Sequence, residues 1–225
     1  MNWIEPKRLA PGMTIGIMAP ASASDEDLHR IEEICKAKGY KVLVGESVSR
    51  KGLYGGTPEE QAAEFQYMMT TAPCDAVLAL RGGYGTMRYL ERLDYKAIRK
   101  YRKAFIGYSD CTALHMAINR YSRLITYHGP MGVDFKAERK ADIDALFNVL
   151  EGKLKVIEPL PEPPRGAIGT ELGEGIFRGG NMTILSVLSG TPYFLEDESW
   201  EDTLLFIEDV GEAPYKLDRM LQQFR

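Results

Sequence analysis

The chain is poor in the residues that build several common kinds of site. It has 225 residues but only three cysteines and three histidines. The cysteines, Cys35, Cys74 and Cys111, are widely spaced, form no CxxC pair and cluster with no histidine. This pattern argues against both a disulfide framework and a zinc site. We therefore expect no structural metal and no metal cofactor.

Long apolar runs and an excess of positive charge are missing as well. No stretch approaches the ~20 apolar residues that a membrane helix needs, and charged residues and a proline at positions 5–8 interrupt the start where a signal peptide would be apolar. The formal net charge is −4, so no broad basic field attracts nucleic acid or anionic lipid. The basic run at 99–103 is typical of a solvated helix end. The sequence predicts a soluble, cytoplasmic protein that binds neither membrane nor nucleic acid.

The first 150 residues alternate between short apolar runs and amphipathic helical patterns. The apolar runs predict strands near residues 14–19, 41–44, 75–80, 104–107 and 124–127. Two helix starts lie between them: Ser24 is a candidate N-cap with Asp27 three residues on, and residues 57–60 (TPEE) form a capping box with proline at the first helical position. Further helices are expected near 86–93 and 111–120. The alternation favours an α/β fold, a mostly parallel sheet with helices on both faces.

The composition changes near residue 158. Four prolines within residues 158–165 cannot lie in a helix or a central strand, so a linker is predicted over 159–166. It separates an N-terminal α/β domain, residues 1–158, from a C-terminal β-rich part, residues 167–225, which is small for an independent core.

The C-terminal part contains fewer recognisable elements. A glycine-rich stretch at 173–180 is followed by patterns for a helix near 183–188, a strand near 203–207 and a last helix from Pro214. We expect the apolar face of that last helix to be exposed or covered by a neighbour; it consists of Leu217, Met220, Leu221 and Phe224.

Unusual sequences stand at the carboxyl ends of the predicted strands, where parallel sheets bind ligands. Residues 107–111 (GYSDC) lie between a strand and a helix, which is the context of a nucleophile elbow around Ser109. The pattern GxSxC is weaker than GxSxG, and a serine that caps the next helix explains it equally well. The two roles coexist, because a nucleophile benefits from the positive end of a helix dipole.

The segment at residues 81–85 (RGGYG) follows the third strand. Its three glycines let the backbone turn tightly and direct N–H groups at an oxyanion or a phosphate. A plain strand-to-helix turn explains the same residues. The segment has neither the Lys-Ser/Thr ending of a Walker loop nor a dinucleotide fingerprint.

Glu208 and Asp209 close an apolar strand, either because the strand reaches solvent or because one of them orients a histidine. His29 lies on the polar side of its helix, and His115 lies on a helix that leads away from the predicted serine site. His128 ends the fifth strand, at the same edge of the sheet as Ser109, and local reasoning alone favours it as a base.

Taken together, these segments resemble the LD-carboxypeptidase family, serine peptidases that act on muramoyl tetrapeptides. The resemblance runs from about residue 10 to the final residue, and its segments occur in the family's order: IGIMAP, RGGYGTMRYLERLD, FIGYSD, YHGPM, GGNMTILSVLSGTPY and LLFIEDVGEAPYKLDRMLQQFR. The resemblance implies an N-terminal α/β domain and a C-terminal β-rich domain with the active site between them.

The resemblance also implies a Ser–Glu–His triad, in which Ser109 matches the nucleophile and Glu208 the acidic member. The histidine of the family lies well beyond the segment that matches Glu208, and His128 matches a different position. The chain is therefore expected to be a C-terminally truncated member, inactive as given unless His128 or another chain supplies the base.

The remaining site residues follow from the same resemblance. The backbone N–H groups of Gly83 and Asp110 would form the oxyanion hole, and Arg81, Gly82 and Tyr84 would line the substrate site. The implied reaction releases terminal D-alanine from cell-wall murein tetrapeptides during peptidoglycan recycling in the cytoplasm. It needs no cofactor. The resemblance also implies a homodimer, as is common in the family. Two alternatives stay open: a related immunity hydrolase for peptide-nucleotide antibiotics of the microcin type, and a non-catalytic binding protein.

Overall fold

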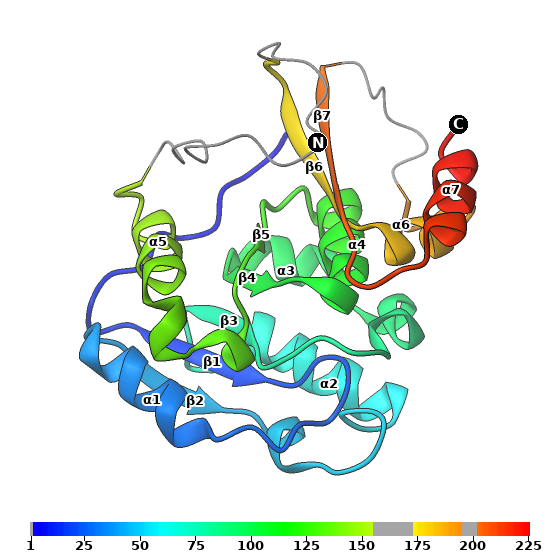
Figure 1. The fold of residues 1–225 in the computed structure, drawn as a ribbon. Helices are drawn as coiled ribbons and strands as arrows, with labels where there is room; N and C mark the ends of the chain where they lie inside the picture. The colour runs from blue at the N-terminus through cyan, green and yellow to red at the C-terminus, as the bar shows by residue number, and fades with distance from the viewer. Residues whose placement is uncertain (1, 155–172, 195–201) are drawn as a thin grey trace.

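A five-stranded parallel sheet and the helices that cover it form the larger part of the molecule (Figure 1). The computed structural model describes residues 2–154, 173–194 and 202–225. Among them, five strands are ordered β2-β1-β3-β4-β5 and every neighbouring pair is parallel. The strands are β1 (Thr14–Met18), β2 (Lys41–Val44), β3 (Ala76–Ala79), β4 (Ala104–Gly107) and β5 (Tyr127–His128). The α/β fold predicted from the alternating pattern is confirmed.

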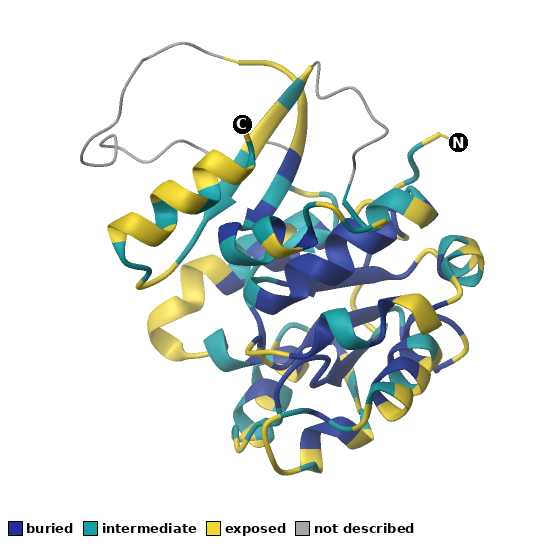
Figure 2. Ribbon diagram, turned by 90° about the vertical axis from the view of Figure 1, so that its right-hand side faces the viewer, coloured by how far each residue is buried: buried dark blue, intermediate teal, exposed yellow. Residues whose placement is uncertain are grey.

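Helices cover both faces of this sheet, and the side chains of each strand alternate between two apolar clusters. Val77 and Phe105 point to the cluster that contains residues of α2, α3 and α4, whereas Leu78 and Ile106 point to the cluster with residues of α1 and α5. The helices are α1 (Leu28–Ala37), α2 (Pro58–Met69), α3 (Tyr95–Tyr101), α4 (Thr112–Ser122) and α5 (Lys140–Leu150). Figure 2 shows the buried residues gathered around the strands and on the inner sides of the helices.

One predicted helix start is confirmed and the other is wrong. Thr57 and Glu60 exchange hydrogen bonds, 3.2 Å from the Glu60 N–H to the Thr57 hydroxyl and 2.8 Å in return, and Pro58 follows the cap. Ser24 does not cap α1. Its hydroxyl accepts from Glu26, and Asp27 caps the helix instead by accepting from the His29 N–H at 3.0 Å. Asp27 directly precedes the first helical residue, which is where a side-chain cap must stand.

Other differences concern helices near the edge of the sheet. Residues 86–93 form two 3-10 turns, η2 (Thr86–Arg88) and η3 (Leu90–Arg92), rather than one helix. Neither α3 nor α5 was predicted. The basic run at 99–103 does end α3, but Lys103 is buried there and donates to the carbonyl oxygens of Met68 and Ala72.

The C-terminal part is a second, two-stranded parallel sheet made of β6 (Ile176–Asn181) and β7 (Thr203–Glu208), with α6 (Met182–Leu188) and α7 (Pro214–Gln223). β6 runs through the glycine-rich stretch where no strand was predicted. A Cβ at Gly179 would lie 1.6 Å from the Phe206 carbonyl oxygen, so the two strands approach too closely for any side chain there.

The predicted linker, residues 159–166, lies outside the described residues, so the division into domains stays a prediction. Among the described residues, no helix combines the length and the apolar character needed to cross a bilayer.

Candidate active site

Ser109 stands on a sharp turn between β4 and α4. Its φ angle is +60°, in the left-handed region that residues other than glycine rarely occupy. The 3-10 turn η4 (Ser109–Cys111) leads directly into α4. α4 begins without a side-chain cap, which counts against the interpretation of Ser109 as a capping residue. A strained, half-exposed serine between strand and helix has the geometry of a nucleophile elbow.

The glycine loop, residues 81–85, lies directly against this serine. A Cβ at Gly82 would approach the Ser109 Cβ to 2.9 Å and its Oγ to 3.0 Å, so only glycine fits beside the hydroxyl. Gly83 follows with φ +114°, and its N–H donates to no acceptor among the described residues. Ser22, which sequence reasoning missed, holds the loop from the end of β1: its hydroxyl accepts from the Tyr84 N–H at 3.0 Å.

Asp110 fastens the same loop to the elbow. Its carboxylate is buried and accepts from the Thr86 N–H at 2.9 Å, and its carbonyl oxygen accepts from the Thr86 hydroxyl at 2.7 Å. Burial raises the pKa of Asp110, and the hydrogen bonds from Thr86 only partly oppose this.

The two carboxylates at the end of β7 have different surroundings. Asp209 accepts from the Thr183 N–H at 2.9 Å and the Thr183 hydroxyl at 2.7 Å, which fixes it to the start of α6. Although burial opposes it, these hydrogen bonds lower the pKa of Asp209. Burial raises the pKa of Glu208, against a hydrogen bond from Asn181. Asp209 is therefore held by its hydrogen bonds to Thr183. Glu208 is the carboxylate that lies near His128 of the other sheet.

A short chain of contacts brings Glu208 to the elbow side of the sheet. Thr112, three residues after Ser109, accepts from the Asn181 N–H at 3.0 Å. Asn181 is the register partner of Glu208. A Cβ at Gly180 would lie 2.7 Å from Thr112, so glycine permits this close approach. The structure thus joins the two segments that sequence reasoning placed in one site.

The three histidines differ sharply in their surroundings. His29 is exposed and lies 3.6 Å from Glu33 on α1. His115 was expected on a helix leading away from the site, but its ring is buried with Nε2 2.8 Å from the Gly107 carbonyl oxygen, two residues before Ser109. Burial lowers the pKa of His115 to about 4.

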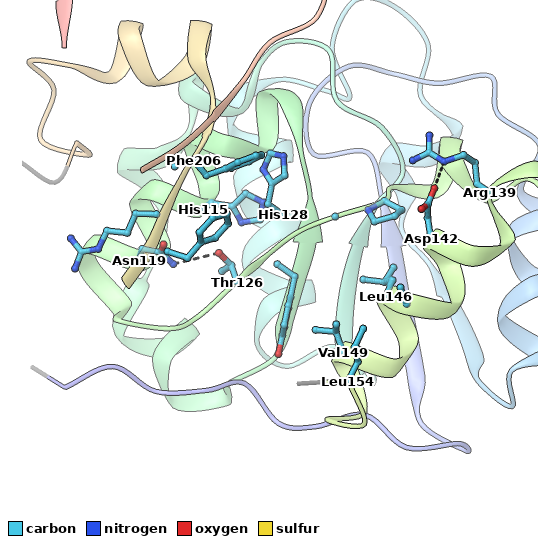
Figure 3. Close-up of a pocket in the computed structure, with 17 residues that line it drawn as sticks. His115, Asn119, Thr126, His128, Arg139, Asp142, Leu146, Val149, Leu154 and Phe206 are labelled. Atoms are coloured by element: carbon cyan, nitrogen blue, oxygen red, sulfur yellow. Dashed lines mark hydrogen bonds and ion pairs between the residues drawn. The ribbon is translucent and has the colours of Figure 1, made fainter. Parts of the chain in front are cut away.

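His128 lies at the end of β5 with its Nε2 3.8 Å from Glu208 Oε1. Its ring contacts Phe206 edge-on, with the ring centroids 5.1 Å apart, as Figure 3 shows beside His115. Burial lowers the pKa of His128. A cavity of about 470 Å³ opens next to it, between β5, α5 and the two-stranded sheet.

Comparison with known proteins agrees with this geometry. Residues 15–129 match the LD-carboxypeptidase N-terminal domain, and residues 174–225 match the LD-carboxypeptidase C-terminal domain. The chain belongs to the LD-carboxypeptidase family. It is accordingly a serine-type carboxypeptidase, a hydrolase, as the sequence resemblance predicted.

Individual relatives cover nearly the whole chain. A probable murein peptide carboxypeptidase of Bacillus subtilis is 36% identical over 98% of this chain and 70% of its own length. The microcin C7 self-immunity protein MccF of Escherichia coli is 26% identical over 96% of this chain and 72% of its own. The crystal structure of a muramoyltetrapeptide carboxypeptidase from Oxalobacter formigenes superposes with a TM-score of 0.77 at 29% identity, covering 94% of this chain and 70% of that one.

Proposed function

We propose that Ser109 is the nucleophile of an acyl-transfer reaction that removes terminal D-alanine from murein tetrapeptides. The observation that carries the proposal is the left-handed conformation of Ser109, with Gly82 packed so closely against its hydroxyl that no side chain fits at that position. The N–H groups of Gly83 and Asp110 would donate hydrogen bonds to the developing oxyanion, whose stabilisation is commonly the largest catalytic contribution. The similarity to murein peptide carboxypeptidases supports the substrate.

The acid and base roles follow from the carboxylates and histidines. Glu208 would orient an imidazole that takes the proton from Ser109 and returns it to the leaving amine. His29 is on the far helix α1 and His115 is bonded to a backbone carbonyl, so neither serves. In the family resemblance His128 is not the base either. We therefore propose that these 225 residues, without a further histidine, release D-alanine only slowly.

Arg81 and Tyr84 would bind the substrate next to the serine. Arg81 is exposed and forms no ion pair with any described residue, so its charge is available for the terminal carboxylate that a carboxypeptidase must recognise. Tyr84 is 55% exposed and its ring lies 5.8 Å from that of Tyr54, which offers an apolar surface beside Arg81. We place the reaction in cytoplasmic peptidoglycan recycling, and we keep the homodimer as an expectation.

Binding tests the substrate without requiring turnover. Titration calorimetry of a murein tetrapeptide onto the Ser109→Ala chain should give saturable binding, and the C-terminal amide of the same peptide should bind more weakly. Arg81→Gln should weaken the binding of the peptide with a free C-terminal carboxylate and leave the binding of the amide nearly unchanged. Absence of binding to either peptide would contradict the proposed substrate.

The similarity to the microcin C7 self-immunity protein supports a second candidate, a hydrolase of peptide-nucleotide antibiotics. Titration of an aminoacyl sulfamoyl nucleoside distinguishes this hydrolase from a murein carboxypeptidase. Only the antibiotic hydrolase is expected to bind the nucleoside more tightly than the tetrapeptide. A chain that binds either ligand but never reacts with a serine-directed fluorophosphonate, even with imidazole added, would instead be a non-catalytic binding protein.

A further inference from the structure

His128 and Glu208 are partly buried polar groups that lie close together where the two sheets meet. His128 ends β5 of the five-stranded sheet and Glu208 ends β7 of the two-stranded sheet, and their Nε2 and Oε1 atoms are 3.8 Å apart. Their side chains are 23% and 26% exposed. Glu208 Oε1 and His128 Nδ1 have no hydrogen-bond partner among the described residues. A separation of 3.8 Å exceeds a hydrogen bond, but it is short enough that a small shift would bring the two atoms within hydrogen-bond distance.

The ring of His128 is held from several sides. It contacts Phe206 at 5.1 Å, Tyr108 at 6.0 Å and His115 at 6.2 Å between ring centroids. Its backbone is in register with Gly107, two residues before Ser109. The imidazole therefore has a fixed orientation relative to the elbow, and any group that it holds acquires the same fixed relation.

The surroundings disfavour a full ion pair between the imidazole and the carboxylate. Burial lowers the pKa of His128 and raises that of Glu208, so the pair is poorly described as two full charges. A neutral imidazole that carries its proton on Nε2 donates to a carboxylate without adding a competing cation. Among the described residues, the other titratable or charged groups around the pair or its cavity are Asp209 after β7, Tyr108 after β4, Tyr127 on β5, His115 on α4, Arg178 on β6, and the mutually paired Arg139 and Asp142 at the start of α5.

We propose that His128 is a positioning residue, which donates from Nε2 to Glu208 and so fixes this carboxylate for the histidine that it would orient. The positioning role of His128 rests on the function proposed above for Glu208. The proposed hydrogen bond between His128 and Glu208 does not depend on that function. The 3.8 Å separation lies across a junction between two sheets, so the proposed hydrogen bond requires only a small movement of one sheet relative to the other.

Imidazole ¹H–¹⁵N NMR of the full chain tests the contact directly. We expect the Nε2–H tautomer for His128. Glu208→Gln should lower the pKa of His128, because the carboxylate that favours its protonated form is removed. Asp209→Asn is the matched control: it neutralises the adjacent carboxylate, which is bonded to Thr183, and should leave His128 nearly unchanged. An Nδ1–H tautomer, or equal effects of the two substitutions, would overturn the proposal.

Two substitutions of His128 separate positioning from packing. His128→Gln keeps a side-chain donor, and His128→Phe keeps an aromatic ring without one. By ¹³C NMR of the carboxyl group, the pKa of Glu208 should rise in His128→Phe and stay close to wild type in His128→Gln. Equal pKa values in both variants would refute the positioning role, and if the Phe variant does not fold, the Glu208→Gln comparison decides alone. A chain that fails to bind tetrapeptide refutes the proposed function but leaves this coupling measurable.

Discussion

The two sheets of this molecule differ in how completely they bury their apolar residues. In the five-stranded sheet every residue of β3 and β4 is buried, with apolar clusters on both faces. In the two-stranded sheet none of the described residues of β7 is buried, and the same holds for α7. Phe177 is 68% exposed and Leu205 is 52% exposed. The sheet of the first region is covered by apolar clusters on both faces, whereas β7 and α7 of the second region stay partly or fully exposed.

The residues of the candidate active site are divided between these two regions. Ser109 and the glycine loop belong to the region whose sheet is covered on both faces, whereas Glu208 stands on the more exposed region. The contact between the regions is made by α6, whose Met182, Leu185 and Leu188 are buried, and by the bond from Asn181 to Thr112. The position of Glu208 relative to Ser109 therefore depends on the packing at this junction.

The largest expected effect contrasts the two cores. Phe105→Ala removes a fully buried ring between α2 and the sheet and should reduce the free energy of unfolding by about 3–5 kcal/mol. Leu205→Ala in the half-exposed β7 should change it by no more than about 0.5 kcal/mol. Urea unfolding followed by circular dichroism measures both. Similar losses would show that the C-terminal region is as tightly packed as the sheet.

Gly179→Ala tests whether the second sheet can fail alone. A Cβ there would collide with the Phe206 carbonyl, and the strain should cost about 1–3 kcal/mol within this region. Hydrogen exchange should rise at amides of β6 and β7 while β3 and β4 stay protected. The exposed turn residue Gly190, where a Cβ meets nothing within 4 Å but φ is +81°, offers a milder control. Equal loss of protection in both sheets would contradict separate behaviour.

Asp209 should matter for structure where Glu208 does not. Asp209→Ala removes the acceptor for the Thr183 N–H at the start of α6 and should destabilise the chain by about 1 kcal/mol, as loss of a helix cap does. Glu208→Gln keeps the shape of the side chain and should leave thermal unfolding nearly unchanged. The reverse order would assign the structural role to Glu208.

The smallest effect concerns pH. Because burial raises the pKa of Asp110 in the folded state, its contribution to stability is greatest below the ordinary carboxyl range and declines as the pH rises through the raised pKa. Asp110→Asn removes this decline, so the difference in unfolding free energy between the variant and the wild-type chain should move in the variant's favour as the pH rises from acid to neutral. A difference that is independent of pH would mean that the Asp110 carboxyl has the same pKa in the folded and unfolded chain.

The sequence was most informative where a strand and a chemical group coincide. Apolar runs located four strands of the large sheet, and the fifth was predicted at 124–127 but lies at Tyr127–His128. The position of Ser109 after the fourth strand predicted the elbow. Ser22, Thr112 and Asn181 were missed because their bonds join segments 62 to 69 residues apart, which no local pattern records. β6 was missed because its glycines carry no apolar alternation, and His115 was misplaced because a helix position does not reveal that its ring turns back to Gly107.

Release of D-alanine from a murein tetrapeptide tests the central claim most directly. The wild-type chain and Ser109→Ala should be compared with and without added imidazole, which can act as a base in solution. We predict little release from the wild-type chain alone, a clear increase with imidazole, and no such increase in Ser109→Ala. Release that persists unchanged in Ser109→Ala would contradict the assignment of the nucleophile.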